Sequence, residues 1–480
     1  MRHFHYATLE EIRRAAEEAG ARRVRFVDSP AEIREALARP VFVGGASVGN
    51  SIAIHPMEGC DGDAEGRPGE LTWRRYERFA RGGAKLIWFE ATAVRREGRA
   101  NPRQLSIHAG SVVELARLLD HTRKVHRQAW GSDDDLLIPI QLTHSGRFSW
   151  PKRIIAGHNP LVDRKTGTPA DLPLISDGDL ERLEDDFVFA ATLALEAGFM
   201  AVDVKATHGY LAAELLGAKT RPGPYGGPLE NRVRFLRNVV GKIRATFGRK
   251  LLIAMRLGCY DGVPYVRDPA SGVGVPMEFP VPYPHGFGVD PRDPLQVDLA
   301  EVKQAIGWFR DDGVELLSVS LGVPYYNPHV GRPFEKPDEG NYEQPEHPLA
   351  GVDRHFRVTA ELQAAFPDLP VLGAGYSWLQ RFAPHAAAYN LRAGGARFFG
   401  MGRNALAYPD FPKDVLETGE FREARVCHTL TYCSYLMRQK NHPLGQFPTG
   451  CPPFDKERYG TVVKAAREVA RSGATKIRVP

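Results

Sequence analysis

The sequence predicts an α/β protein, a (β/α)8 TIM barrel with short N-terminal helices and a C-terminal extension. From Val41 onward, short apolar runs of strand length alternate with amphipathic stretches of helix length. Eight runs can be counted, which is the number of parallel strands that closes such a barrel. No Gly-x-Gly-x-x-Gly follows the first run, and this disfavours an open doubly wound sheet, the structural alternative.

The predicted elements follow in order along the chain. The strands are Ser51–His55, Ala84–Glu90, Leu136–Leu142, Met200–Lys205, Leu251–Arg256, Glu315–Ser320, Pro370–Gly373 and Ala396–Gly400. The helices between them are Leu71–Arg81, Val112–Trp130, Asp179–Ala197, Leu229–Phe247, Asp298–Arg310, Phe356–Phe366 and Gln380–Ala393.

Two helix starts precede the barrel. Thr8 and Glu11 form a capping box, and Ser29 stands as an N-cap directly before a proline. We therefore divide the chain into an N-terminal helical extension (1–40), the barrel (41–412) and a C-terminal extension (413–480).

A Pro- and Gly-rich insertion, 262–297, follows the fifth strand. Eight prolines between Pro264 and Pro294 predict neither regular helix nor regular sheet. Because it follows the carboxyl end of a strand, we expect it over the barrel mouth, either as a lid or as a loop that only packs or mediates oligomer contact.

Composition excludes several classes of protein. A net charge of +5 on 480 residues, without a basic run, predicts no nucleic-acid partner. No apolar segment approaches the roughly 20 residues that span a membrane, and the N-terminus has no signal-peptide pattern. Five widely spaced cysteines argue against a secreted disulfide framework, so a cytoplasmic protein is expected. A homo-oligomer is left open.

Catalytic groups cluster after the fourth strand. Lys205, His208 and Tyr210 can each carry or donate a proton, and they stand within six residues of one another at a strand end. A loop rich in Gly and Pro follows, and a helix is predicted from about Pro228. This is the arrangement of an α/β-barrel active site.

This stretch resembles the strand-four signature of the old yellow enzyme family of flavin-dependent ene reductases. The shared residues are His208, Gly209, Tyr210, Leu211, Tyr225, Gly226, Gly227, Glu230, Asn231, Arg232, Arg234 and Phe235. Lys205 departs from the family, which has a histidine at that position. The likeness extends from about Asn50 to Phe411.

Other strand ends carry the resemblance further and imply an FMN site. Pro56-Met57-Glu58 would lie along the flavin, and Ala91 beside it. Gln141 offers the amide donor and acceptor that the flavin pyrimidine edge needs, whereas His144 alone is typical of a structural histidine. The predicted cofactor-binding residues are Pro56, Met57, Glu58, Ala91, Gln141, Arg256, Gly373, Gly375, Gly402 and Arg403.

Arg256 is predicted to point into the barrel, where a cation needs an anionic partner. The resemblance supplies the N1/O2 region of the flavin; a salt bridge to Glu90 or Asp203 is the alternative. Gly373, Gly375, Gly402 and Arg403 follow the last two strands, whose loops form the common phosphate site of barrels.

The resemblance also implies the chemistry. FMN would accept a hydride from NADH or NADPH and pass it to an activated C=C bond of a small unsaturated substrate, or work in the oxidative direction. Tyr210 would protonate the alkene, and His208 with Lys205 would polarise its carbonyl. Alternatively, Lys205 only neutralises the reduced flavin or pairs with Asp203.

A second class of function stays open. Lys205 also suits a Schiff base in a non-redox, phosphate-binding, aldolase-like barrel, and an inactive flavin-binding scaffold would keep the fold without the reaction. That class leaves Gln141, Arg256 and the surroundings of Ala91 unexplained.

The C-terminal extension carries Cys427, Cys433 and Cys451. The resemblance is nearest to the branch of 2,4-dienoyl-CoA reductase, enoate reductase and trimethylamine dehydrogenase, but without the extra nucleotide-binding domain. Relatives with a four-iron cluster have a fourth cysteine where this chain has Leu430. A cluster normally takes four thiolates, so we expect no intact iron–sulfur cluster and no metal.

Overall fold

The computed structural model describes residues 3–439, 442 and 445–471, so parts of both predicted extensions lie outside the described residues. One sheet runs in the order β4-β3-β15-β14-β13-β8-β7-β6-β5, and its pairings are parallel. Its strands are β3 (Ile52–Ile54), β4 (Leu86–Ile87), β5 (Phe89–Ala93), β6 (Pro139–Thr143), β7 (Ala201–Val204), β8 (Leu252–Gly258), β13 (Leu316–Ser320), β14 (Val371–Gly373) and β15 (Phe398–Met401).

The two ends of this sheet meet at Trp88. β4 and β5 flank Trp88 and together form the predicted second strand; β4 pairs with β3, and β5 pairs with β6. A further parallel bridge joins Leu86 to Leu137. The broken strand therefore brings the sheet round into a barrel, which confirms the predicted (β/α)8 fold.

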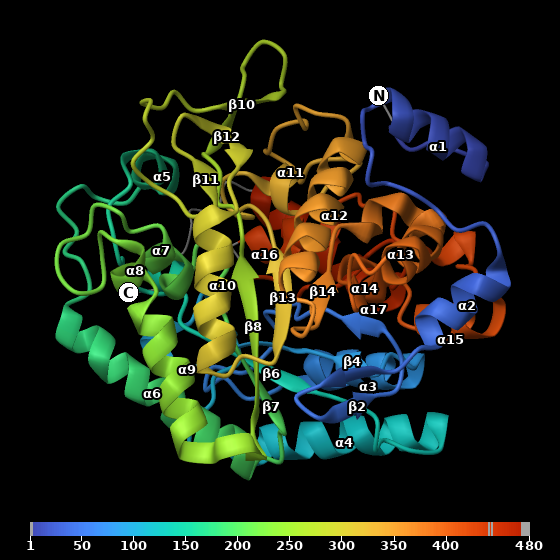
Figure 1. The fold of residues 1–480 in the computed structure, drawn as a ribbon, viewed down its shortest axis with the longest axis horizontal. Coiled ribbons are helices and arrows are strands. Elements are labelled where there is room, and N and C mark those ends of the chain that lie inside the picture. The colour runs from blue at the N-terminus through green and yellow to red at the C-terminus, as the bar shows by residue number, and fades with distance from the viewer. Residues whose placement is uncertain (1–2, 440–441, 443–444, 472–480) are drawn as a thin grey trace.

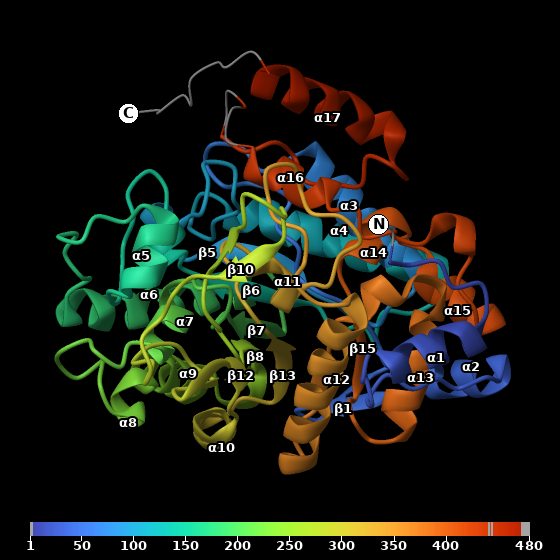
Figure 2. The ribbon, with the colours of Figure 1, turned by 90° about the horizontal axis from the view of Figure 1, so that it is seen from above.

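An outer ring of helices covers the barrel (Figures 1 and 2). It consists of α3 (Glu70–Gly82), α4 (Val112–Trp130), α6 (Asp177–Glu196), α8 (Leu229–Arg232), α9 (Arg234–Phe247), α10 (Ala300–Asp312), α12 (Pro348–Ala365) and α13 (Ala383–Arg392). The predicted helix 229–247 is divided at Val233, α12 begins eight residues before its predicted start, and residues 376–382 before α13 form a 3-10 turn.

Two short helices precede the barrel, α1 (Leu9–Glu18) and α2 (Pro30–Ala38). The Glu11 backbone N–H donates to Thr8 Oγ1 and the Thr8 N–H donates to the Glu11 carboxylate, which confirms the capping box. Ser29 caps α2 as predicted. The hairpin of β1 (Val41–Val43) and β2 (Ala46–Val48) then packs against residues at the amino ends of the strands and closes that end of the barrel core.

The insertion 262–297 was expected to form neither regular helix nor regular sheet. That expectation was wrong, because the insertion contains four short strands. β9 (Tyr265–Arg267) pairs with β10 (Gly274–Pro276), and β11 (Val289–Asp290) pairs with β12 (Asp293–Val297), both antiparallel. The ribbons are short, so the prolines stand at their ends or on edges where no ladder hydrogen bond is lost.

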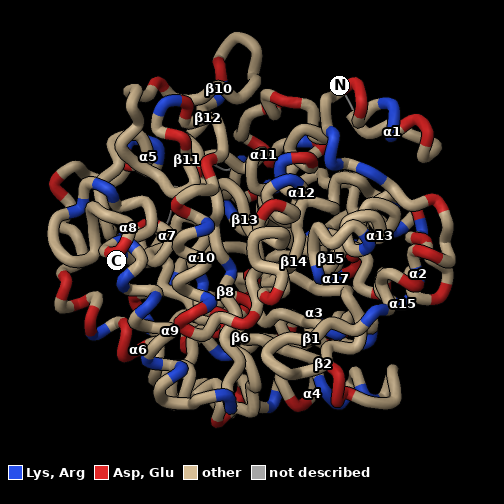
Figure 3. The backbone as a smooth tube through the Cα atoms, in the orientation of Figure 1, with Lys and Arg blue, Asp and Glu red and all other residues tan. Residues whose placement is uncertain are grey.

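The remaining helices are short or lie in the C-terminal extension. They are α5 (Pro160–Thr166), α7 (Leu211–Leu216), α11 (Pro328–Gly331), α14 (Arg403–Ala407), α15 (Phe411–Thr418), α16 (Tyr432–Arg438) and α17 (Lys456–Arg471). No helix in the described ranges is long and apolar enough to cross a bilayer. Charges of both signs are interspersed along the chain (Figure 3).

Candidate active site

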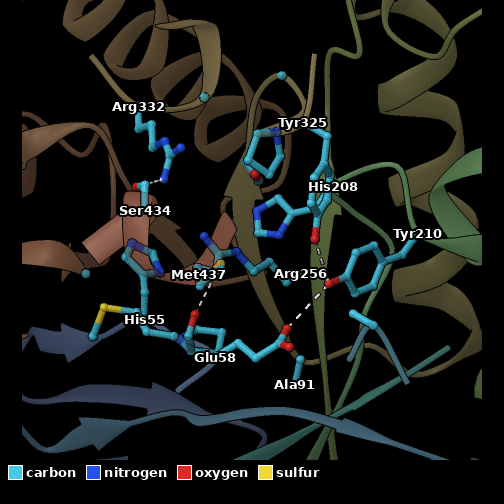
Figure 4. A pocket seen from close by; sticks show the side chains of 18 of the residues that line it. His55, Glu58, Ala91, His208, Tyr210, Arg256, Tyr325, Arg332, Ser434 and Met437 are labelled. Carbon is cyan, nitrogen blue, oxygen red and sulfur yellow. Dashed lines mark hydrogen bonds between the residues drawn. The ribbon is translucent and has the colours of Figure 1, made fainter. Parts of the chain in front are cut away.

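A cavity of about 520 Å³ opens at the carboxyl ends of the barrel strands. Figure 4 shows Glu58, His208, Tyr210 and Arg256 converging on it; Glu58 follows β3, His208 and Tyr210 follow β7, and Arg256 lies in β8. Among the residues predicted for the barrel site, Gly373 alone is not part of its wall. The predicted residues that line it are Pro56, Met57, Glu58, Ala91, Gln141, Lys205, His208, Tyr210, Arg256, Gly375, Gly402 and Arg403.

The end of β7 positions the predicted catalytic groups. The Lys205 N–H donates to the Leu142 carbonyl (3.1 Å) and the Ala206 N–H to the Arg256 carbonyl (2.9 Å), so the strand end stays fixed between its neighbours. The chain then turns through His208, with φ +64°, a left-handed conformation that is uncommon for a residue with a side chain. Tyr210 follows as the residue that precedes α7.

His208 is neutral in this environment. Burial lowers the pKa of its imidazole well below the ordinary value, and the charges of Arg256 and Lys205 lower it further. A neutral imidazole keeps one N–H and can donate it to a carbonyl oxygen without carrying a charge.

Glu58, Lys205 and Tyr210 form a group at the cavity wall. Asn101 Nδ2 donates to Glu58 Oε1 (2.6 Å), and the Tyr210 hydroxyl lies 3.4 Å from Glu58 Oε2 and 3.1 Å from the Tyr325 hydroxyl. Lys205 Nζ lies 3.9 Å from the centre of the Tyr210 ring, a cation–π contact.

Burial and these contacts shift the pKa values of the three groups in different directions. Burial raises the pKa of the Glu58 carboxyl, which the charge of Lys205 opposes, and lowers the pKa of Lys205 to about 8, which the charge of Glu58 opposes. Burial also raises the pKa of Tyr210 well above its usual value. At neutral pH Tyr210 holds its proton and Lys205 is a cation.

Asp203 has a structural role in the site. Gln141 Nε2 donates to Asp203 Oδ2 (2.6 Å), and the backbone N–H of Arg256 donates to Oδ1 (2.7 Å). In the described part of the chain, neither Lys205 nor the Arg256 guanidinium lies within 4 Å of the Asp203 carboxylate, so both alternatives that paired them with it were wrong. The Asp203 carboxylate fixes Gln141 and strand β8 instead.

Glu90 is likewise committed elsewhere. Its carboxylate receives Arg75 Nη2 (2.6 Å) and the Gly59 N–H (2.7 Å), in a buried network that includes Asp61. The alternative of a Glu90–Arg256 salt bridge was therefore wrong. This network holds the segment that follows β3, and with it Glu58.

Arg256 is left with an unused donor. Its Nη1 donates to the Pro56 carbonyl (3.3 Å), its Nε has no partner among the described residues, and burial lowers its pKa to about 10. A buried guanidinium in this state favours an anionic group in the cavity beside it.

A second set of unused donors belongs to Arg332, in the loop after β13, and to Arg403, after β15. Arg403 Nη2 donates to the Pro333 carbonyl (2.8 Å), while Arg403 Nη1 and Arg332 Nε have no partner in the described ranges. Gly375 has φ +92°, and a Cβ there would lie 2.8 Å from His355 Cβ; a side chain at Gly400 would meet the His55 ring. Close backbone and two guanidinium groups form a cradle that suits a phosphate.

Several residues of the wall were missed by the sequence reasoning. Tyr325 and Arg332 come from the loop after β13, and six residues come from the C-terminal extension: Cys433, Ser434, Met437, Arg438, Gln446 and Thr449. Arg332 donates to the Ser434 hydroxyl, which ties the two segments together. By contrast, no residue of the insertion 262–297 belongs to this wall.

The three cysteines of the extension are free thiols. Burial raises the pKa of Cys427 to about 11 and also raises that of Cys451. Within residues 3–439, 442 and 445–471, no group of three or more His, Cys, Asp or Glu side chains is arranged to hold a metal ion.

The residues present fit FMN. Arg256, a part-buried cation with no salt-bridge partner among the described residues, lines the cavity, and Arg332 and Arg403, each with an unpaired donor, line it together with Gly375 and Gly402. A flat ring system that becomes anionic on reduction suits the first, and a phosphate suits the second.

Comparison with known proteins agrees with this geometry. Residues 36–270 match the model of the NADH:flavin oxidoreductase / NADH oxidase family. An NADPH dehydrogenase of Geobacillus sp. (strain WCH70) is 31% identical over 292 residues, 56% of this chain and 82% of that protein. The chain belongs to the NADH:flavin oxidoreductase / NADH oxidase family. An NADPH dehydrogenase of Bacillus subtilis (strain 168) is 29% identical over 59% of this chain and 72% of its own length.

Solved structures share the fold. A 2-naphthoyl-CoA reductase in complex with 2-naphthoyl-CoA superposes with a TM-score of 0.62 at 17% identity, over 84% of this chain and 55% of that one. The old yellow enzyme homologue from Zymomonas mobilis gives 0.55 at 22% identity, over 79% and 92%. The chain thus spans about half the length of the first structure. Family membership sets aside the non-redox, aldolase-like alternative and makes FMN the cofactor.

Proposed function

We propose that this chain is an FMN-dependent oxidoreductase that passes a hydride from NADH or NADPH to an activated C=C bond of a small molecule, or runs the reverse, oxidative reaction. One observation carries the proposal. The neutral imidazole of His208 and the protonated hydroxyl of Tyr210 face the same cavity as the guanidinium of Arg256, whose Nε has no hydrogen-bond partner among the described residues.

The proposed cofactor site uses both sets of unused donors. Pro56, Met57, Ala91 and Gln141 line the cavity around Arg256 and would surround the ring system. Arg403 and Arg332 would hold the phosphate, with Gly375 and Gly402 allowing the backbone to approach it. When bound, FMN supplies the two-electron hydride chemistry.

The residues of β7 and α7 would then handle the proton. His208 donates its N–H to the carbonyl oxygen of the substrate, and the Lys205 cation stabilises the negative charge that grows there. Tyr210 gives its hydroxyl proton to the alkene carbon next to that carbonyl. Glu58, next to Tyr210 and with a raised pKa, is placed to return a proton to the phenolate.

The division of the chain follows from the same assignment. We propose residues 41–412 as the FMN-binding barrel, with 1–40 and 413–480 as extensions. The second extension contributes to the cavity wall through α16 and the residues that follow it.

Two anaerobic half-reactions test this function. NADPH or NADH should bleach the flavin absorbance of the purified protein, and a simple enone such as 2-cyclohexenone should restore it. Denaturation should release FMN, identified by chromatography. A protein purified without flavin, or with a flavin that neither nicotinamide reduces, would contradict the proposal.

A further inference from the structure

The charge of the cavity wall is strongly one-sided. Among the described residues, one carboxylate, Glu58, lines it, against eight basic side chains: Arg147, Arg153, Lys165, Lys205, Arg256, Arg332, Arg403 and Arg438. The net charge of the whole chain is only +5 on 480 residues, so this excess of cations is local to the cavity. A concave site with one sign of charge concentrates ligands of the opposite sign.

Six of the eight cations are already accounted for. In the proposed function FMN uses Arg256, Arg332 and Arg403, and the carbonyl oxygen of the substrate uses Lys205. Arg147 is paired with Asp163 and Glu214, and Arg438 with Asp338 (2.5 Å). Two cations, Arg153 and Lys165, are left over.

Arg153 and Lys165 each lie beside another cation. Arg153 Nη1 donates to Thr168 Oγ1 (3.1 Å), which also receives Arg147 Nη1 (3.1 Å); burial and then Arg147 lower the pKa of Arg153. Lys165 has no hydrogen-bond or ion-pair partner within the described residues, and burial and then Arg438 lower its pKa. Lys165 is part-buried, and Arg153 is exposed at the cavity. Cations that repel their neighbours are stabilised by an anion placed beside them.

The position of these two residues separates them from the phosphate of FMN. Lys165 is in α5 and Arg403 begins α14, and Figures 1 and 2 both show α5 and α14 on opposite sides of the barrel. Phe148 and Tyr325 stack at 3.8 Å between ring centres and form an apolar wall of the same cavity.

Building on the proposed function, we propose that the alkene reduced here is an organic anion. Its unsaturated, apolar body lies along Phe148 and Tyr325, and a carboxylate or phosphate remote from the reacting double bond binds Lys165 and Arg153. Both anion classes share the chemistry that a lysine and an arginine recognise.

Binding of matched probes tests this inference. The probes are three benzylideneacetones that differ only at the para position, where they carry a carboxylate, a phosphonate or a primary amide. Each is titrated at low salt into FMN-loaded wild-type protein, into the Lys165→Ala/Arg153→Ala variant, and into Arg164→Ala, which removes an exposed neighbour on α5 that is not in the cavity wall. Flavin absorbance and isothermal calorimetry both report Kd, and calorimetry does not need a flavin signal.

We expect at least one anionic probe to bind wild type at least tenfold more tightly than the amide. The double variant should lose that preference and bind the amide as before, whereas Arg164→Ala should behave as wild type. The carboxylate and phosphonate arms tell which anion is favoured. An amide that binds wild type as tightly as both anions would overturn the proposal.

The nicotinamide donor is also anionic, so a further measurement distinguishes binding of the donor from binding of the substrate. If the double variant leaves the Kd values of the anionic probes unchanged but slows flavin reduction by NADPH, the two cations serve the dinucleotide and the substrate proposal is wrong. Flavin content and reduction by NADPH in wild type are measured on the same samples, so a failure of the proposed function is visible separately.

Discussion

The ends of β7 and β15 occupy equivalent places in the barrel but contribute opposite kinds of group. β7 is followed by titratable side chains, Lys205, His208 and Tyr210, at the cavity wall. β15 is followed by Gly402 and then Arg403, so close backbone and one fixed charge replace acid–base groups. The barrel therefore separates proton chemistry from cofactor retention by strand. Substitutions after β7 should change rates and leave FMN bound; substitutions after β15 should do the reverse.

Tyr210→Phe is expected to give the largest effect. Removal of a positioned general acid slows proton transfer by about 10² to 10⁴-fold. Stopped-flow reoxidation of the reduced protein by an enone should show this loss, while reduction by NADPH and FMN content stay at the wild-type level. Tyr325→Phe, which removes the neighbouring hydroxyl and keeps Tyr210, is the matched control. Wild-type reoxidation in Tyr210→Phe would show that the acid lies elsewhere.

His208→Ala should slow reoxidation slightly less than Tyr210→Phe does. Loss of one preorganised donor to a developing oxyanion corresponds to about 2 to 4 kcal/mol. The enone should also bind more weakly, because the same N–H contacts its ground-state carbonyl. Reoxidation kinetics over a range of enone concentrations give both effects. His121→Ala serves as the control, because His121 contacts Trp73 of α3 and does not line the cavity. Loss of FMN from His208→Ala, with the reoxidation rate unchanged, would contradict the claim that residues after β7 act in the reaction and residues after β15 retain FMN.

Arg403→Ala tests the other strand. A charge-assisted contact to phosphate contributes about 1.5 to 3 kcal/mol, so the Kd of FMN should rise by roughly 10- to 100-fold. Fluorescence titration of the apoprotein with FMN measures this, and the exposed Arg397, just before β15, provides the control Arg397→Ala. At saturating FMN, the reoxidation rate should return to that of wild type; a rate that stays low would mean that Arg403 also acts in the reaction.

The success of sequence reasoning followed the same division. Residues in the carboxyl half of a strand or shortly after it, such as Gln141, Glu58, Tyr210 and Arg403, were placed in the cavity because barrel topology brings all strand ends together. Arg332 and Arg438 were missed, since their places depend on how a long loop and the C-terminal extension pack, which no periodicity encodes. The insertion 262–297 was expected over the mouth on the same topological rule. It packs against the loop that follows β13, where the Tyr265 N–H donates to the Tyr326 carbonyl (2.8 Å), but none of its residues lines the cavity.

The smallest effect should come from Lys205, and it should be visible in the pH dependence of the reoxidation rate. Burial lowers the pKa of its ammonium to about 8, so it is a cation below that pH and loses its charge as the pH rises through it. Stabilisation of negative charge on the substrate oxygen is therefore complete near pH 7 and declines between about pH 7.5 and 9. We expect the reoxidation rate of wild type to fall by up to roughly tenfold across this range, an amount equal to about 1.4 kcal/mol.

Three variants serve as controls. The reoxidation rate of Lys205→Met should be low and independent of pH over the same range. The rate of Lys205→Arg, whose charge persists, should also be independent of pH, but without the low value. Tyr210 and His208 do not titrate there, because burial moves the pKa of Tyr210 up and that of His208 down. Glu58 faces Lys205 and has a raised pKa, so Glu58→Gln separates the two groups: a decline that persists in Glu58→Gln and vanishes in Lys205→Met belongs to the lysine. A decline that survives in Lys205→Met would assign the charge on the β7 side of the cavity to another residue.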